Sequence, residues 1–402
     1  MTTFKAPANL KAWHISIVVY FGVFGMGWAS LMVRLPEVRH LVNVTTAELG
    51  IILFVGSIGS IISVTQAGRF IARFGTRVAI ITGVTVVTLG MLAQTICIVN
   101  HLPAGYALFA LIAGLGMGIG DVGINVDGSA IETASGKTAL PKMHAAFSIG
   151  TFVGAGLGTL ATTLSIPLLA QMIFFAALNF SVPLLTAKHL PHGNGIEARQ
   201  VAGEPKKAPR VAVWRNRTVI FLALGILGVT VAEGASNDWL TIALVDDFKV
   251  SPTIAGLGFA TLLAAMTTIR FFGGKIADRF GKGRTLQVLA FTGVIGLLMI
   301  ILSHNIFLAF VGAILWGCGV ALGFPLFLSA AGEGENSARR VAFVASAGYL
   351  AFLVGPPLLG FVGQAIGVVN MYWIVLVFIV LSVVVAGAAG NTKASAKAVK
   401  GE

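Results

Sequence analysis

Twelve long apolar runs constrain this chain more than any other feature of its sequence. Each run has about 20 residues, the length that an α-helix needs to cross the roughly 30 Å hydrocarbon core of a bilayer. The chain is 56% hydrophobic and only 10% charged, whereas a soluble globular protein has roughly 25% charged residues. We therefore predict an all-α membrane protein with twelve transmembrane helices, near residues 12–33, 49–67, 76–98, 104–126, 143–164, 167–187, 218–241, 253–273, 285–303, 306–330, 340–363 and 366–389.

The basic residues divide unevenly between the two sides that these helices define. With a cytoplasmic N-terminus, 24 of the 27 Lys and Arg residues fall in cytoplasmic segments, and Arg34, Arg39 and Lys249 fall outside. Membrane proteins carry such an excess in their cytoplasmic loops. We expect a multi-pass membrane protein with both termini in the cytoplasm. This topology explains the net charge of +12 without a nucleic-acid partner, because a nucleic-acid-binding face needs basic residues clustered on a soluble fold.

The sequence lacks the short motifs of common enzymes and of ATP-driven pumps. It contains no GxxxxGK[ST] phosphate-binding loop, no HExxH and no GxSxG. The two cysteines, Cys97 and Cys318, lie inside apolar runs without the spacing of metal ligands. We expect no enzyme activity, no cofactor and no bound metal.

The chain repeats itself with an offset of 206 residues. GRFIARFGTR begins at Gly68 and GKIADRFGKGR begins at Gly274, each between the second and third helices of its half. We predict two pseudo-symmetric six-helix bundles, 1–187 and 218–389, joined by a cytoplasmic linker rich in Pro, Gly and charge at 188–217 and followed by a cytoplasmic tail at 390–402. Six spans repeated in parallel are typical of secondary transporters, whose substrate site lies at mid-membrane between the halves.

The second copy of this loop resembles the signature loop of the major facilitator superfamily. The pattern G-x-x-x-D-R-x-G begins at Gly274, and in the first copy Ala72 replaces the aspartate. The resemblance covers essentially the whole chain and implies the major facilitator fold. It also implies that the loop latches the cytoplasmic side of the outward-facing state; plain topology-setting charge is the alternative. The latch candidates are Gly68, Arg73, Arg77, Gly274, Asp278, Arg279 and Arg284, with Glu132 and Glu333 as expected partners of Arg73, Arg77 or Arg284.

Within this superfamily the chain resembles the fucose–proton symporter branch and its uncharacterised bacterial inner-membrane permease relatives. This resemblance implies a location in the bacterial cytoplasmic (inner) membrane. Asp121 followed by Asn125 is similar to the acid-x-x-x-Asn of that branch, and WASLMVRLPEV, AEGASNDW and GYLAFLVGPPLLG resemble segments of the permeases. Features of drug antiporters are missing, since helix 104–126 has no Arg and FVGAGLG has no proline. The fucose symporter has a second acid where this chain has Met32 and then Arg34, so the resemblance does not imply fucose as the solute.

Asp121 is the first candidate for proton coupling. At 100° per residue, Asn125 and Glu132 lie within about 40° of Asp121 on the helix, whereas Asp127 points elsewhere. A charged carboxyl group inside a membrane is costly unless it faces water or a partner, and burial favours its neutral form. We expect Asp121 to carry protons, with solute hydrogen bonding and a structural helix cap as the alternatives. Asp127 and Glu132 are expected at the cytoplasmic end of the helix.

The seventh predicted helix carries a second polar cluster. Glu233 and Asn237 share a face at i and i+4, toward the periplasmic third of the membrane, and Asp238 follows them. Glu233 is a second proton or solute candidate, with a water-exposed rim as the alternative. Arg34 is expected at the same level, where it either pairs with Glu233 or Asp238 as an outer gate or snorkels. Arg270 is expected near the inner end of its helix, snorkelling or in the latch.

Several further side chains are candidates for the wall of a substrate cavity. Besides Asn125 and Asn237, these are Trp28, Trp239, Trp316 and Tyr349. Aromatic faces suit solute stacking, and core packing is the alternative for the tryptophans. His144 is expected as a neutral packed side chain rather than a proton relay.

These features predict a proton-coupled symporter that moves a small polar solute by alternating access, as a monomer in the lipid bilayer. One alternative is a proton-coupled antiporter that exports a metabolite or an amphipathic compound. The other is a non-transporting membrane receptor. The intramembrane polar stripe that contains Asp121 favours a transporter.

Overall fold

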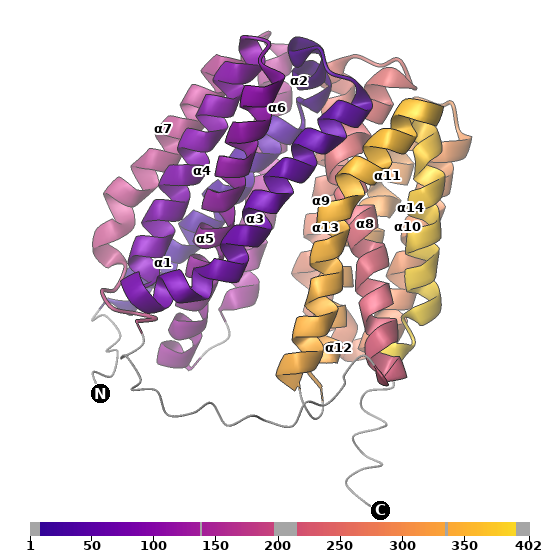
Figure 1. Ribbon diagram of the computed structural model, residues 1–402. Helices are drawn as coiled ribbons and strands as arrows, with labels where there is room; N and C mark the ends of the chain where they lie inside the picture. The colour runs from indigo at the N-terminus through magenta and orange to yellow at the C-terminus, as the bar shows by residue number, and fades with distance from the viewer. Residues whose placement is uncertain (1–8, 137–138, 197–214, 334–336, 391–402) are drawn as a thin grey trace, which may run out of the picture. The chain divides into compact units, whose positions relative to one another are not determined.

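The computed structural model describes residues 9–136, 139–196, 215–333 and 337–390. These residues form two compact units, which we call unit 1 (up to residue 196) and unit 2 (from residue 215). Figure 1 draws unit 1 from indigo to magenta and unit 2 from pink through orange to yellow.

Unit 1 contains seven α-helices and one short 3-10 helix in its described residues. They are α1 (Leu10–Met32), α2 (Leu35–Val42), α3 (Thr46–Phe74), α4 (Thr76–Val99), α5 (Pro103–Ser135), α6 (Leu140–Thr163), α7 (Leu168–Thr186) and η1 (Ala187–His189).

Unit 2 also contains seven α-helices in its described residues. They are α8 (Arg217–Asp246), α9 (Pro252–Phe280), α10 (Lys282–Leu302), α11 (Ile306–Val320), α12 (Gly323–Ala331), α13 (Ser337–Ile366) and α14 (Val368–Val385).

The predicted all-α membrane fold is confirmed. Twelve stretches of the described residues are helical, long and apolar enough to cross a membrane, and each overlaps one of the predicted runs. The described ranges contain no strand. α5 extends past the predicted 104–126 to Ser135, so that Asp127 and Glu132 belong to the helix itself.

The tenth span is interrupted, although the sequence predicted one unbroken helix at 306–330. The chain leaves the helical conformation after Val320 and begins α12 at Gly323. The cause is Pro325, which has no N–H and therefore cannot donate to the carbonyl of Ala321, four residues earlier. The interruption leaves that carbonyl without its helical partner.

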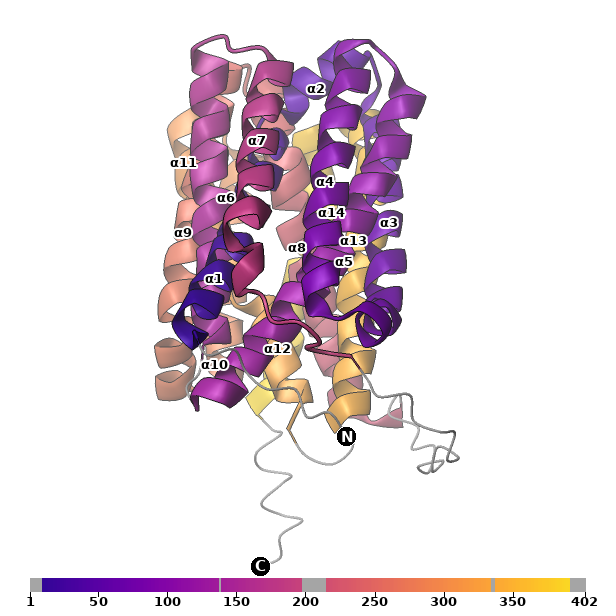
Figure 2. The same cartoon turned by 90° about the vertical axis from the view of Figure 1, so that its left-hand side faces the viewer.

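Glycine lets the helices of unit 1 approach one another closely. α5 packs between α3 and α4 (Figure 1). A Cβ atom on Gly114 would collide with the backbone of Gly56 in α3, and one on Gly116 would collide with the backbone of Val87 in α4. The two small-residue faces of α5 therefore serve two different neighbours. On another side of the unit, α7 lies beside α4, and α6 packs against α1 (Figure 2).

Unit 2 repeats this glycine contact between equivalent helices. α10 packs against α11, and a Cβ atom on Gly319 would collide with the backbone of Gly293. α8 is surrounded by α9, α12, α13 and α14, which buries most of its apolar side chains. The core of unit 2 therefore forms around α8, the helix that carries Glu233 and Asp238.

The described start of the predicted linker packs onto unit 1. The backbone N–H of Thr76, the first residue of α4, donates to the carbonyl of Asn194 at 2.9 Å. Residues 197–214 of the predicted linker and residues 391–402 of the predicted tail lie outside the described residues.

Candidate functional site

A chain of hydrogen bonds joins Asp121, Asn125 and His144 within unit 1. Asn125 Nδ2 donates to the backbone carbonyl of Asp121 at 2.8 Å and to its Oδ1 at 3.2 Å. His144 Nε2 lies 3.1 Å from Asn125 Oδ1. The predicted i,i+4 pairing of Asp121 and Asn125 on α5 is thus present, and α6 adds a histidine to it.

The directions of these hydrogen bonds follow from the chemistry of the groups. A backbone carbonyl only accepts, so the amide NH₂ of Asn125 must face Asp121 and its oxygen must face His144. The oxygen in turn requires a proton on His144 Nε2. His144 and Asp121 are exposed, and the His144 ring lies 4.9 Å from the Phe21 ring. His144 is therefore part of a polar cluster, whereas the sequence predicted a packed side chain.

Asp127 occupies a different face of α5 from Asp121 and is completely buried. Its Oδ2 accepts from Trp13 Nε1 at 2.7 Å, and its Oδ1 accepts from Asn194 Nδ2 at 2.7 Å. Asp127 therefore ties α1 and the segment after η1 to α5. The sequence separated Asp127 from the Asp121 face but did not predict either partner.

The two glutamates proposed as latch partners make different contacts from those expected. Glu132 Oε1 accepts from the backbone N–H of Ala139 at 2.6 Å and of Leu140 at 2.9 Å, which caps the N-terminus of α6. Glu333 pairs with Lys282 Nζ at 2.5 Å.

The candidate latch arginines of unit 1 also have local partners. Arg73 lies over the ring of Phe74, 5.2 Å from its centroid. Arg77 Nη1 contacts Nε2 of His192, which belongs to the segment after η1. Gly68 is exposed.

In unit 2 the signature loop is exposed. Gly274, Asp278 and Arg284 are exposed, and Arg279 lies over the ring of Phe280, 5.4 Å from its centroid. Asp278 makes no hydrogen bond or ion pair with the described residues. The latch role of this loop stays a prediction.

An ion pair inside the spans of unit 2 joins α8 to α9. Arg270 Nη2 lies 2.6 Å from Glu233 Oε1. Arg270 Nε donates to the carbonyl of Ala321 at 3.0 Å, the same carbonyl that Pro325 leaves without a helical donor. The guanidinium therefore links α8, α9 and the interruption of the tenth span.

The sequence predicted Glu233 toward the periplasmic third and Arg270 near the inner end of its helix, and it did not predict that the two side chains pair. Glu233 lies 16 residues from the start of α8 at Arg217, and Arg270 lies 10 residues from the end of α9 at Phe280. At 1.5 Å per residue the two Cα atoms differ in depth by roughly 9 Å. Two long side chains extending toward each other cover that difference, which residue counting alone does not include.

Arg34 has its ion-pair and hydrogen-bond partners within unit 1, and its role in an outer gate stays a prediction. Its Nε and Nη2 each donate to Glu37 at 2.7 Å. Its Nη1 donates to Gln171 Oε1 at 2.8 Å and to the carbonyl of Ile166 at 3.0 Å. The side chain is 4% exposed, so its guanidinium is enclosed and joins α2 to the start of α7.

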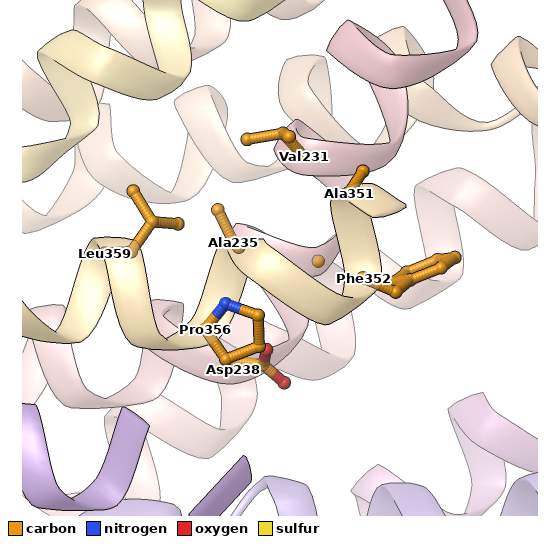
Figure 3. A pocket seen from close by; sticks show the side chains of 9 residues that line it. Val231, Ala235, Asp238, Ala351, Phe352, Pro356 and Leu359 are labelled. Carbon is orange, nitrogen blue, oxygen red and sulfur yellow. The ribbon is translucent and has the colours of Figure 1, made fainter. Parts of the chain in front are cut away.

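Asp238 lines a small pocket between α8 and α13 (Figure 3). Val231 and Ala235 of α8 line the pocket with Asp238. Phe352 and Pro356 line it from α13. The pocket volume is about 10 Å³, close to the minimum for one water molecule. Asp238 makes no hydrogen bond to the described residues.

The aromatic candidates separate into buried and accessible groups. Trp239 and Trp316 are 0% exposed, as expected for side chains that pack in the core. Trp316 packs edge-on to Tyr372 with ring centroids 5.1 Å apart. Trp28 and Asn237 are half-buried. Tyr349 is 42% exposed and packs edge-on to Phe324.

Polar and charged groups on twelve apolar spans, in two units of repeated plan, are typical of a multi-pass membrane transport protein. The chain belongs to the Major Facilitator Superfamily, whose family model matches residues 17–334 and, in a second match, residues 239–401. The predicted family is thereby confirmed, and the chain is a transporter of that family by sequence and fold.

Known proteins with the same fold or a similar sequence agree with this assignment. An uncharacterised transporter of the same family from Yersinia pestis is 28% identical over 353 residues, covering 87% of this chain and 89% of the relative. The nucleoside transporter NupG superposes with a TM-score of 0.73 at 16% identity, covering 94% of this chain and 99% of that chain. The E. coli fucose:proton symporter FucP superposes with a TM-score of 0.63 at 16% identity, covering 94% and 98%.

Proposed function

We propose that this chain is a proton-coupled symporter that moves a small polar solute by alternating access, as a monomer in a bacterial inner membrane. The observation that carries the proposal is the Asp121–Asn125–His144 chain of hydrogen bonds within α5 and α6. It combines a carboxyl group, an amide and an imidazole on accessible positions of membrane-spanning helices.

The chemistry of this cluster suits reversible protonation. An ionised Asp121 is stabilised by the Asn125 NH₂, and the protonated form removes a charge from a region where charge is costly. An imidazole titrates in the physiological range and passes protons between partners. Asp121 is the proton-carrying group in this proposal, and His144 orients Asn125 toward it.

Reconstituted flux tests the coupling. A thermal-shift screen of the purified chain against sugars, polyols, amino acids, amphipathic cations and small carboxylates first identifies a solute. Wild-type proteoliposomes with an acidic exterior should accumulate it, and Asp121→Asn should abolish accumulation, because an amide carries no proton under these conditions. Counterflow of the solute without a gradient should continue in the same variant.

Two further measurements sharpen this test. Asp121→Glu keeps a carboxyl group at the same position and should retain gradient-driven accumulation. Undiminished accumulation in Asp121→Asn would reject the coupling role of Asp121. Accumulation driven by an acidic interior would instead indicate exporting antiport.

A further inference from the structure

The Glu233–Arg270 ion pair lies in unit 2 and is separate from the Asp121–Asn125–His144 cluster of unit 1. Its geometry indicates the charge of the solute. We propose that the solute bears an anionic group, that Arg270 binds this group, and that Glu233 takes up a proton when it releases Arg270. The proposal rests on the proposed function, for which it names the substrate class.

Arg270 has N–H groups that donate to no described residue. A guanidinium offers five N–H groups, and the described residues engage Nε through the Ala321 carbonyl and Nη2 through Glu233. No described group accepts from Nη1. The side chain of Arg270 is 26% exposed and that of Glu233 is 13% exposed. The cation is therefore the more accessible partner, and its planar fork suits a carboxylate or another oxyanion.

Arg34 provides the internal contrast. Its Nε, Nη1 and Nη2 all donate to Glu37, Gln171 or Ile166 inside unit 1, and its side chain is 4% exposed. An arginine with a structural role is enclosed in this way. Arg270 differs in both accessibility and unused donors.

The interrupted span keeps Arg270 in place when its ion pair opens. The Ala321 carbonyl lacks a helical donor because of Pro325, so its hydrogen bond to Arg270 Nε does not compete with helix formation. A guanidinium held at Nε still presents Nη1 and Nη2. The anion site is thus preorganised by backbone rather than by Glu233.

Charge balance supplies the link to protons. The empty site contains Glu233⁻ and Arg270⁺, whose charges cancel. An anion that displaced Glu233 without protonation would leave a net negative charge among apolar spans, which is costly. When a proton from water bonds to a Glu233 carboxylate oxygen and the anion pairs with Arg270, the charges cancel again. One proton on Glu233 therefore accompanies one negative charge bound at Arg270.

Among the described residues of unit 2, Arg270 is the cation that pairs with Glu233. Among the described residues of the helices packed on α8, α11, α12 and α14 carry no charged side chain. α13 has Arg339 and Arg340 at its first turns, and α9 has Lys275, Asp278 and Arg279 beyond Arg270. On α8 itself the other acids are Asp238 and Asp246. Arg270 is the described cation that contacts Glu233.

Ligand-dependent thermal unfolding of the purified full-length chain tests the proposal. The probes are matched pairs at constant ionic strength: acetate and acetamide, lactate and lactamide, gluconate and sorbitol. The anions should stabilise the wild type more than their neutral partners do, and more at mildly acidic than at mildly alkaline pH. In Glu233→Gln, Arg270 lacks its counter-ion, so the anions should bind equally well at both pH values, and roughly 10- to 100-fold more tightly than to the wild type at the alkaline pH.

Variants at Arg270 provide the decisive comparison. Arg270→Gln leaves the Glu233 carboxylate unpaired and is expected to fold poorly, so the double variant Glu233→Gln/Arg270→Gln removes both charges together. It should fold and lose anion stabilisation roughly 10- to 100-fold. Lys275→Gln, an exposed position on the same helix, is the matched control and should bind the anions as the wild type does.

Three results would overturn the proposal: equal stabilisation by the neutral partners, anion binding that survives in the double variant, and no anion stabilisation of Glu233→Gln. Because no gradient is used, Asp121→Asn should retain anion binding. Undiminished proton-driven accumulation in Asp121→Asn with intact anion binding would reject the proposed coupling at Asp121 alone. Proton-driven accumulation of a neutral solute would reject the anion site alone.

Discussion

Two aspartates six residues apart on α5 have opposite environments. Asp121 is exposed and Asp127 is 0% exposed. Six residues correspond to 600° around a helix, which places the two carboxyl groups on different faces. Asp127 is buried because Trp13 and Asn194 donate to its two oxygens, and charge-assisted hydrogen bonds of this kind offset the cost of burial.

Asp127→Asn should destabilise the chain by about 2 kcal/mol, the usual range for hydrogen bonds to a charged group. An amide presents its NH₂ to one of two donors, so either Trp13 or Asn194 loses its acceptor. Thermal unfolding in detergent measures the loss. Asp278→Asn, at an exposed position, should leave the unfolding temperature unchanged, and an equal effect of the two substitutions would contradict this account.

At the level of elements, the close contacts between helices depend on particular glycines. Gly116 faces the backbone of Val87 in α4, whereas Gly156 in α6 has open space where a Cβ atom would lie. The two positions therefore separate a packing requirement from helix propensity.

Gly116→Ala should cost about 1–3 kcal/mol, because the added methyl group forces α4 and α5 apart. Gly156→Ala should be neutral or stabilise the chain by up to about 1 kcal/mol, because alanine is the better helix former. Thermal unfolding of the two variants side by side makes the comparison. Similar tolerance at both positions would show that the α4–α5 contact adjusts freely.

At the level of the whole molecule, the uneven distribution of basic residues predicts the orientation in the membrane. The short loops that hold most Lys and Arg residues are expected in the cytoplasm. His304, between α10 and α11, is expected on the outside, and Arg69, near the end of α3, on the inside. Both are exposed.

Cysteine labelling checks this orientation. In a background without Cys97 and Cys318, a membrane-impermeant maleimide added to intact cells should modify His304→Cys. Arg69→Cys should be modified only after the membrane is opened. The reverse pattern would invert the predicted topology.

The sequence alone determined the family, the number of spans and the pairing of Asp121 with Asn125. These features follow from local composition and from the i,i+4 geometry of one helix. Pro325 was also visible inside the predicted span 306–330, and its missing N–H is the signal that would have located the interruption.

Only the tertiary structure decided which distant side chains meet. Arg34 binds Glu37 and Gln171 within unit 1, and Glu233 binds Arg270 within unit 2, and the sequence predicted neither set of partners. The physical reason is that a long side chain reaches across several ångströms of helix height, and its partner depends on how neighbouring helices are rotated and packed. Residue counting along one helix contains neither quantity, so the partners of His144, Asp127 and Arg270 emerge only when the helices are assembled.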